Sequence, residues 1–345
     1  MKTPGRRGRA VGVAVAKGIG LVVGLFALVL GGWAALTPLP PELRSAERFG
    51  PSLRVLDRSG ALLREVRADD ATRARWVPLA EVGERATEAM LAAEDQRFYR
   101  HGGVDPWAVL RAGGQALREG HVVSGASTLT MQLARLVRPH RRNLWGKLGE
   151  MALALRIEAS LSKAEILEEY LNRAPFGLGV RGLAAGAQLL WGKAPAKLSW
   201  AEAAALAAIP RGPAVYDVRR HPERVRARRD RILTRLHRAG RIDDESYALA
   251  LAEPFVTLDG GGTFGAPHFV EAVARGALPG TVDLRGRADE VTTTLDGALQ
   301  REVENAARST VRALNRRHVT AASVVAIDPA SGEILAYVGS PDYFD

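Results

Sequence analysis

Glu94 is the side chain of this sequence best placed to do chemistry, because it is charged where the helical pattern predicts an apolar residue. Val82, Ala86 and Met90 recur every fourth residue, which predicts one face of a helix, and position 94 continues that face. A carboxylate directed into a core or a cleft suits a general acid or base. The alternative is a helix that ends near position 94, where the carboxylate would meet only solvent or a neighbouring arginine.

A second group of polar residues follows a small-residue turn at positions 125–126. The turn predicts a helix that begins at Ser127 or Thr128, whose N–H groups would form a cradle for a phosphate. Thr128, Gln132 and Arg135 share the polar face of that helix. The segment therefore indicates a site for a phosphorylated ligand.

Glu150 is a second acidic candidate with a weaker signal. Lys147 lies three residues before it, and Glu158 lies eight residues after it. An exposed charged face explains this pattern on a helix that we expect to be buried through Leu144, Leu148, Met151 and Leu155. A role in orienting Lys147 is the functional alternative.

The composition is that of a globular protein with room for two domains, since 345 residues are 47% hydrophobic and 25% charged. The net charge of +10 predicts an anionic partner, which would be nucleic acid, a membrane surface or a phosphorylated substrate. The absence of cysteine excludes disulfides, thiol catalysis and Cys-ligated metal sites.

The N-terminus predicts a membrane anchor. Basic residues in the tail 1–17 precede an apolar run over 18–36, which at about 19 residues is long enough to cross a bilayer. The positive-inside rule then puts the tail in the cytoplasm and the rest of the chain outside, as a single-pass protein. A cleaved signal peptide is the alternative.

The remaining chain divides into a mainly helical domain over 37–255 and a small α+β segment over 256–345. Within the helical domain we expect a hairpin over 53–67. A glycine run at 260–262 breaks the helical pattern just after this domain. In the second we expect a strand over 291–295, a helix over 297–316 and a hairpin over 322–338.

Three signals are discounted. The Ser-x-x-Lys pattern at 160–163 is explained by a capping box between Ser162 and Glu165. The histidines show no metal-ligand spacing, and all but His101 are predicted to be structural or surface residues. The ten arginines from Arg219 to Arg241 predict a solvated face, with contact to anionic lipid head groups as the alternative.

Five ordered blocks of the sequence resemble glycosyltransferase family 51, the glycosyltransferase domain of class A penicillin-binding proteins. Residues 94–105 resemble its first signature and 125–135 its second, while 147–150, 168–172 and 191–207 follow the order of the later blocks. Met131 and the segment 173–177 are similar to the penicillin-binding protein 1C branch. The sequence departs from the broader family at Ala126, Met131 and Gly146, where glycine, glutamine and arginine are common.

The resemblance implies a lysozyme-like domain of two lobes that joins lipid II units into a glycan, with inversion and release of undecaprenyl pyrophosphate. It implies Glu94 as the general base and Glu150 as a supporting catalytic residue. The substrate-binding residues that it implies are Asp95, Phe98, His101, Ser127, Thr128, Gln132, Arg135, Arg142 and Lys147. No protein-bound metal or obligatory cofactor is expected, although Mg²⁺ or Mn²⁺ would help at the pyrophosphate.

The expected partners are lipid II, the growing glycan chain, the membrane and other cell-wall synthesis proteins, with no nucleic acid. Residues 290–343 resemble the linker and opening hairpin of a transpeptidase domain, most of which is absent, so no transpeptidase activity is expected. Two alternatives stay open: a lytic transglycosylase or muramidase-like hydrolase, which also works with one glutamate in a cleft, and a non-catalytic membrane scaffold of a cell-wall complex.

Overall fold

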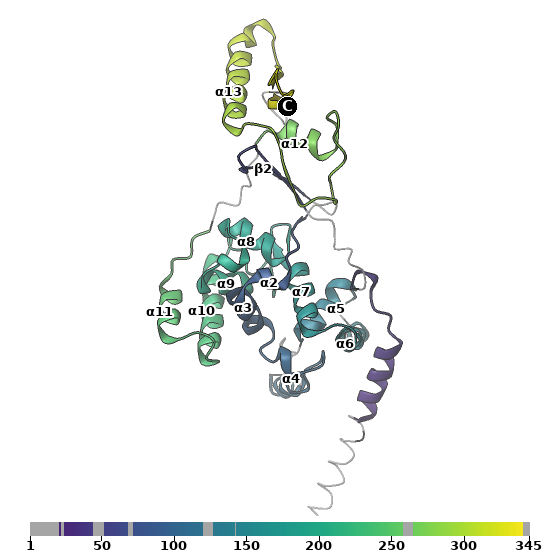
Figure 1. Ribbon diagram of the computed structural model, residues 1–345. Helices are drawn as coiled ribbons and strands as arrows, with labels where there is room; N and C mark the ends of the chain where they lie inside the picture. Colours follow the sequence, from purple (N-terminus) through teal and green to yellow (C-terminus); the bar gives the residue numbers. More distant parts are fainter. Residues whose placement is uncertain are drawn as a thin grey trace, which may run out of the picture. The chain divides into compact units, whose positions relative to one another are not determined.

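The structure is a computed structural model that describes residues 21, 24–43, 52–67, 72–119, 127–141, 143–257 and 265–340. The chain forms two compact units, one made of Met1–Ala46 and Glu94–Tyr170, the other of Glu47–Ala93 and Leu171–Asp345. Both are built mainly from helices, as the sequence predicts (Figure 1).

The first unit contains α5 and α6, which pack against each other. Its elements are η1 (Pro41–Leu43), η2 (Phe98–Arg100), α4 (Pro106–Glu119), α5 (Leu129–Val137), α6 (Leu144–Glu158) and most of α7 (Lys163–Arg173). Leu129 and Leu133 of α5 are buried, together with Leu153 and Ile157 of α6. This packing fixes the side chains on the polar sides of the two helices.

Helix α6 buries a different face from the one that its leucines predict. Leu144 is exposed, and Met151 is only half-buried. Met151 packs with Leu30 and Ala34, which belong to a helical stretch over 24–36. Because α6 has apolar neighbours on two sides, its buried face is shifted from the predicted stripe, and Glu150 falls inside it.

The predicted membrane span over 18–36 overlaps this stretch. Residues 18–20, 22 and 23, like the tail 1–17, lie outside the described residues. Among the residues that the structure describes, no helix has the length and apolarity needed to cross a bilayer. The anchor therefore stays a prediction.

The second unit includes a layer of helices with a small three-stranded sheet. The helices are α2 (Leu79–Val82), α3 (Glu84–Glu94, of which Glu94 belongs to the first unit), α8 (Leu183–Trp191), η3 (Pro195–Lys197), α9 (Trp200–Ala208), α10 (Pro222–Arg238) and α11 (Asp244–Ala252). The sheet has the order β3 (Arg73–Ala74), β5 (Val180–Arg181), β4 (Pro175–Gly177). Helix α9 begins with a capping box of Ser199 and Glu202 and packs against α10.

The same unit holds the predicted α+β segment. Strands β1 (Leu53–Leu56) and β2 (Leu62–Val66) form the predicted hairpin, and β6 (Glu290–Thr292) pairs with β1 in parallel. Helix α12 (Pro267–Ala274) packs on β2, and α13 (Gly297–Leu314), followed by η4 (Asn315–Arg317), packs on the second predicted hairpin, β7 (Val324–Ile327) and β8 (Ile334–Val338). Residues of the first hairpin thus share a core with residues 266–295, a pairing that the sequence does not reveal. The domain boundary at 255 stays a prediction, and the glycine run 260–262 lies outside the described residues.

Candidate active site

Glu94 is the last residue of α3, and its carboxylate is half-buried. Nε2 of Gln132 donates a hydrogen bond to Oε2 of Glu94 over 3.0 Å. The hydroxyl of Tyr170 in turn donates to Oε1 of Gln132 over 3.2 Å. Both ends of the Gln132 amide are engaged, so its orientation is fixed with the N–H side toward the carboxylate. The helix does end at Glu94, as one reading of the sequence predicts, but the carboxylate is held by a partly buried pair of hydrogen bonds.

Asp95 and His101, both predicted to bind substrate, form a buried pair in the structure. Nε2 of His101 lies 3.1 Å from Oδ1 and 3.0 Å from Oδ2 of Asp95. The N–H of Gly103 donates to Nδ1 of His101, which places the ring proton on Nε2. Oδ2 of Asp95 also accepts the N–H of Leu129, the first residue of α5, over 2.9 Å. The pair therefore anchors the start of α5 beside Glu94.

Thr128 is the N-cap of α5, one of the two residues that the sequence offers for this position. Its Oγ1 accepts the N–H of Met131 over 3.1 Å, and its hydroxyl donates to the carbonyl of Gly103. Since Asp95 occupies the N–H of Leu129, the N–H groups of Leu129 and Met131 are both taken. The prediction of a phosphate cradle at this helix start is wrong for these two donors. The turn at 125–126 lies outside the described residues.

Glu150 lies at the centre of a cationic cluster and is only 3% exposed. Nζ of Lys147 donates to Oε1 of Glu150 and, over 2.6 Å, to Oγ of Ser127. Nη1 of Arg135 lies 4.0 Å from Oε2 of Glu150. The alternative that Glu150 belongs to an exposed face is wrong, because the helix buries this side. The side chains of Arg135 and Lys147 are 47% and 37% exposed, so a ligand can reach them.

His140 completes this cluster, and the sequence gives it no role. Its Nε2 lies 2.9 Å from Oε2 of Glu150, and its Nδ1 lies 2.9 Å from the carbonyl oxygen of Arg141. A Cβ added at Gly146 would lie 2.4 Å from Nδ1 of His140 and 2.4 Å from the same carbonyl. Any larger residue at 146 would therefore displace the imidazole. Glycine in place of the arginine common in the broader family is the sequence feature at position 146 that could have indicated this contact.

The remaining predicted residues fall outside this cluster. Phe98 is fully buried, and Nζ of Lys163 lies 4.3 Å from its ring centroid, so it belongs to the core. Arg142 lies outside the described residues. Nζ of Lys163 also donates to the carbonyl of His101 and to Glu158. The hydroxyl of Ser162 bonds Glu165 in the predicted capping box. The Ser-x-x-Lys pattern is thus explained by structure.

The acidic group of the cationic cluster has both of its oxygens engaged by neighbouring side chains. Within the part of the chain that the structure describes, no three His, Asp or Glu residues gather in a way that could hold a metal ion. Glu150, the acidic group of the cationic cluster, already has Lys147 on one oxygen and His140 on the other. The cluster is therefore suited to an anion.

The comparisons with known proteins agree on one family. Residues 59–237 match the family model described as Transglycosylase. The chain is 35% identical to penicillin-binding protein 1C of Escherichia coli over 329 residues, which is 95% of this chain and 41% of the relative. It is 41% identical to a putative transglycosylase of Cupriavidus necator over 180 residues, which is 52% of this chain and 78% of the relative.

A crystal structure of penicillin-binding protein 1A from Haemophilus influenzae is similar with a TM-score of 0.41 and 24% identity, over 79% of this chain and 30% of that one. The chain spans 41% and 37% of the length of two of the penicillin-binding proteins that it matches, those of Escherichia coli and Pseudomonas aeruginosa.

Proposed function

Because the chain belongs to the transglycosylase family, we propose that it is a peptidoglycan glycosyltransferase that polymerises lipid II into β-1,4 glycan strands. The observation that carries this proposal is that α5 carries both the partner of the acid and one of the cations. Gln132 bonds Glu94, and Arg135 lies one turn further along the same side of α5. Arg135 approaches Glu150, which bonds Lys147. The helix pair α5 and α6 thus holds the cations, and α5 also bonds the base at the end of α3.

Glu94 acts as the general base in this proposal. It removes the proton of the 4-hydroxyl of the acceptor sugar as that oxygen attacks the anomeric carbon of the donor chain, with inversion. General base catalysis of this kind contributes roughly 10²–10⁴ in rate. The hydrogen bond from Gln132 holds the carboxylate in one orientation, which keeps the accepting oxygen aligned with the hydroxyl.

The cations stabilise the departing undecaprenyl pyrophosphate. Arg135 and Lys147 bring two positive charges against the one carboxylate of Glu150, so the cluster retains positive charge for an anionic ligand. Glu150 and His140 act by orienting the two cations. Arg142 and Ser127 complete the proposed contacts, while Asp95, His101 and Thr128 position α5.

Any Mg²⁺ or Mn²⁺ at the pyrophosphate would be held chiefly by the phosphates, since the described residues present no metal-ligand cluster. Its chemistry would be to neutralise negative charge on the leaving group. The proposed proton transfer and the stabilisation of the leaving group both use side chains of this chain.

A membrane location fits the exposed apolar residues of the first unit. Trp107 and Leu110 of α4, and Leu144 and Trp145 of α6, are large apolar side chains that face solvent in the structure. Large exposed apolar surface marks a membrane or protein contact. We propose that the span at 18–36 crosses the inner membrane once, with the N-terminus in the cytoplasm, and that this apolar surface meets lipid beside the lipid-linked substrate. Other cell-wall synthesis proteins would be its partners there.

The competing function is that of a lytic transglycosylase or muramidase-like hydrolase. Such an enzyme releases no pyrophosphate, so Arg135 and Lys147 would have no pyrophosphate to bind. Supplying lipid II and polymeric glycan in separate reactions tests the proposal. Growth of polymer from lipid II supports it, whereas shortening of the glycan with no growth from lipid II supports the hydrolase. No change in either substrate supports a non-catalytic scaffold.

A further inference from the structure

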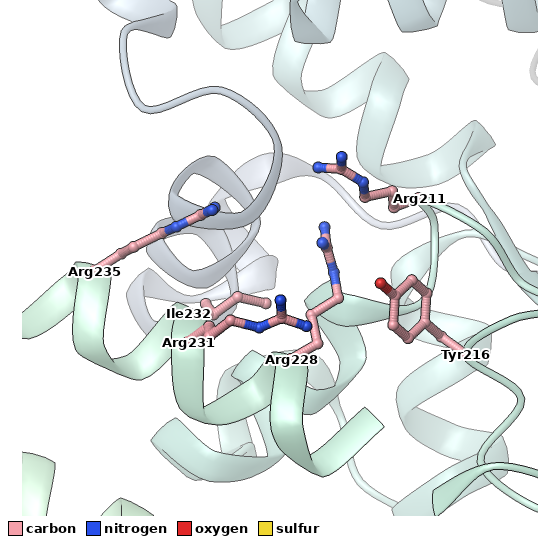
Figure 2. Close-up of a pocket in the computed structure, with 6 residues that line it drawn as sticks. All are labelled: Arg211, Tyr216, Arg228, Arg231, Ile232 and Arg235. Carbon is pink, nitrogen blue, oxygen red and sulfur yellow. The ribbon is translucent and has the colours of Figure 1, made fainter. Parts of the chain in front are cut away.

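Helix α10 of the second unit lines a cavity that is rich in arginine. The cavity has a volume of about 180 Å³ and is lined by Arg211, Tyr216, Arg228, Arg231, Ile232 and Arg235. Figure 2 shows Arg228, Arg231 and Arg235 projecting from α10, with Arg211 and Tyr216 facing the same space. None of these residues belongs to the candidate active site.

The arginines of α10 that line the cavity differ in exposure, because Arg228 is buried whereas Arg231 and Arg235 are exposed. Arg228, Ile232 and Arg235 follow the i, i+4, i+7 spacing that amphipathic helices use to face their own domain. Ile232 on this stripe is buried. Arg235 donates from Nη1 to the carbonyl of Ala92 over 3.1 Å, so this side of α10 faces the last turn of α3. Arg228 and Ile232 thus form a buried part of the cavity lining, and Arg231 and Arg235 form an exposed part.

Two adjacent buried arginines differ in what surrounds them. Arg229 is 1% exposed, and its guanidinium bonds Asp230 and the carbonyl of Glu253. Arg229 thus links α10 to the end of α11. Arg228 is 6% exposed, and its guanidinium lies 5.1 Å from the centroid of the Tyr216 ring, on the wall of the cavity. Arg228 thus brings a buried guanidinium to the cavity.

The lining of the cavity carries four positive charges and no negative one. Four guanidinium groups around one small space repel each other, and an anion between them relieves that repulsion. Guanidinium forks match the oxygens of phosphate, and the phenol of Tyr216 adds a further donor. The volume is below the roughly 300–1,000 Å³ of pockets for drug-sized ligands, which fits a single phosphate group.

We propose that this cavity binds a phosphate group, either a soluble phosphate or the head-group phosphate of an anionic lipid. The proposal does not depend on the glycosyltransferase reaction, since it uses none of the residues assigned to that reaction.

The test measures binding of inorganic phosphate and of short-chain phosphatidylglycerol to the full chain in detergent by calorimetry. Short-chain phosphatidylcholine serves as the lipid without net charge. Every protein carries Arg135→Gln and Lys147→Gln, so that the proposed pyrophosphate site lacks the two cations that contact Glu150. In this background, Arg211→Gln with Arg231→Gln removes two exposed arginines of the cavity. Arg226→Gln with Arg238→Gln is the matched control, because it removes two exposed arginines of α10 that do not line the cavity.

We expect the cavity pair to weaken the Kd for a phosphate ligand about tenfold or more, and the control pair to change it less than about threefold. Loss confined to inorganic phosphate identifies a soluble ligand, and loss confined to phosphatidylglycerol identifies a head group. Equal weakening by both pairs means diffuse surface charge and overturns the proposal. So does a parent protein that binds neither phosphate nor phosphatidylglycerol. Unchanged thermal unfolding of the variants shows that their fold is intact.

Discussion

Replacing Gln132 with alanine should slow lipid II polymerisation about ten- to a hundredfold through kcat, with little change in KM. Gln132 donates to Glu94 over 3.0 Å and is itself held by Tyr170 over 3.2 Å. Without this donor the carboxylate loses its fixed orientation, while the cations of Arg135 and Lys147 stay in place. The effect should therefore fall on the chemical step more than on substrate binding.

The magnitude follows from the type of hydrogen bond. A bond to a charged group is worth about 1.5–3 kcal/mol. Each 1.36 kcal/mol changes a rate about tenfold, which gives the expected range. Tyr170→Phe removes only the neutral bond that holds the Gln132 amide, worth about 0.5–1.5 kcal/mol, so its effect on kcat should be about two- to tenfold.

The assay follows glycan formation from labelled lipid II over a range of concentrations, so that kcat and KM are separated. Gln96→Ala is the matched control, since Gln96 is an exposed glutamine two residues after Glu94. A raised KM with unchanged kcat would refute the reasoning, because it would mean that Gln132 binds substrate directly, as the family resemblance implies. A Tyr170→Phe variant more impaired than Gln132→Ala would also contradict the proposed order of the network.

Three further changes test neighbouring parts of the account. His140→Ala removes one partner of Glu150 and should lower polymerisation about two- to tenfold; full activity in the lipid II assay would show that Lys147 suffices to orient Glu150. Asp95→Ala leaves the N–H groups of His101 and Leu129 without their buried acceptor. The free energy of unfolding should therefore fall by about 3 kcal/mol in urea titrations, and a change below about 1 kcal/mol would argue against an anchoring role. Ser162→Ala should cost about 1 kcal/mol of stability at pH 7. Side-chain and backbone hydrogen bonds from Ser162 hold the pKa of Glu165 below its usual value, so this stabilisation is complete above the ordinary glutamate pKa and is lost as the pH falls through the lowered one. The stability difference between wild type and Ser162→Ala should therefore shrink in acid, and a constant difference down to about pH 2 would contradict the assignment.

Local chemistry made several elements predictable from the sequence. The hairpin over 53–67 and the capping box at Ser162 depend on residues within a few positions, and the structure has both. The parallel pairing of β1 with β6 joins residues more than 200 positions apart, and no local pattern encodes it.

The site was predictable in its residues more than in their roles. Glu94 and Gln132 were identified, but their mutual hydrogen bond depends on how α3 ends beside α5. The burial of Glu150 was missed because periodicity assigns one apolar face to a helix, whereas α6 packs against neighbours on two sides. His140 was missed because it reaches Glu150 from a loop, through space that only glycine leaves open at position 146.

The central claim is tested most directly by polymerisation of lipid II with Glu94→Gln beside Glu84→Gln, an exposed glutamate of the same helix. The amide keeps the shape of the side chain but cannot accept the proton, so we expect Glu94→Gln to lose at least about a hundredfold in kcat while Glu84→Gln keeps wild-type activity. A product ladder from Glu94→Gln equal to that of the wild type would contradict the account, since the base would then be another residue.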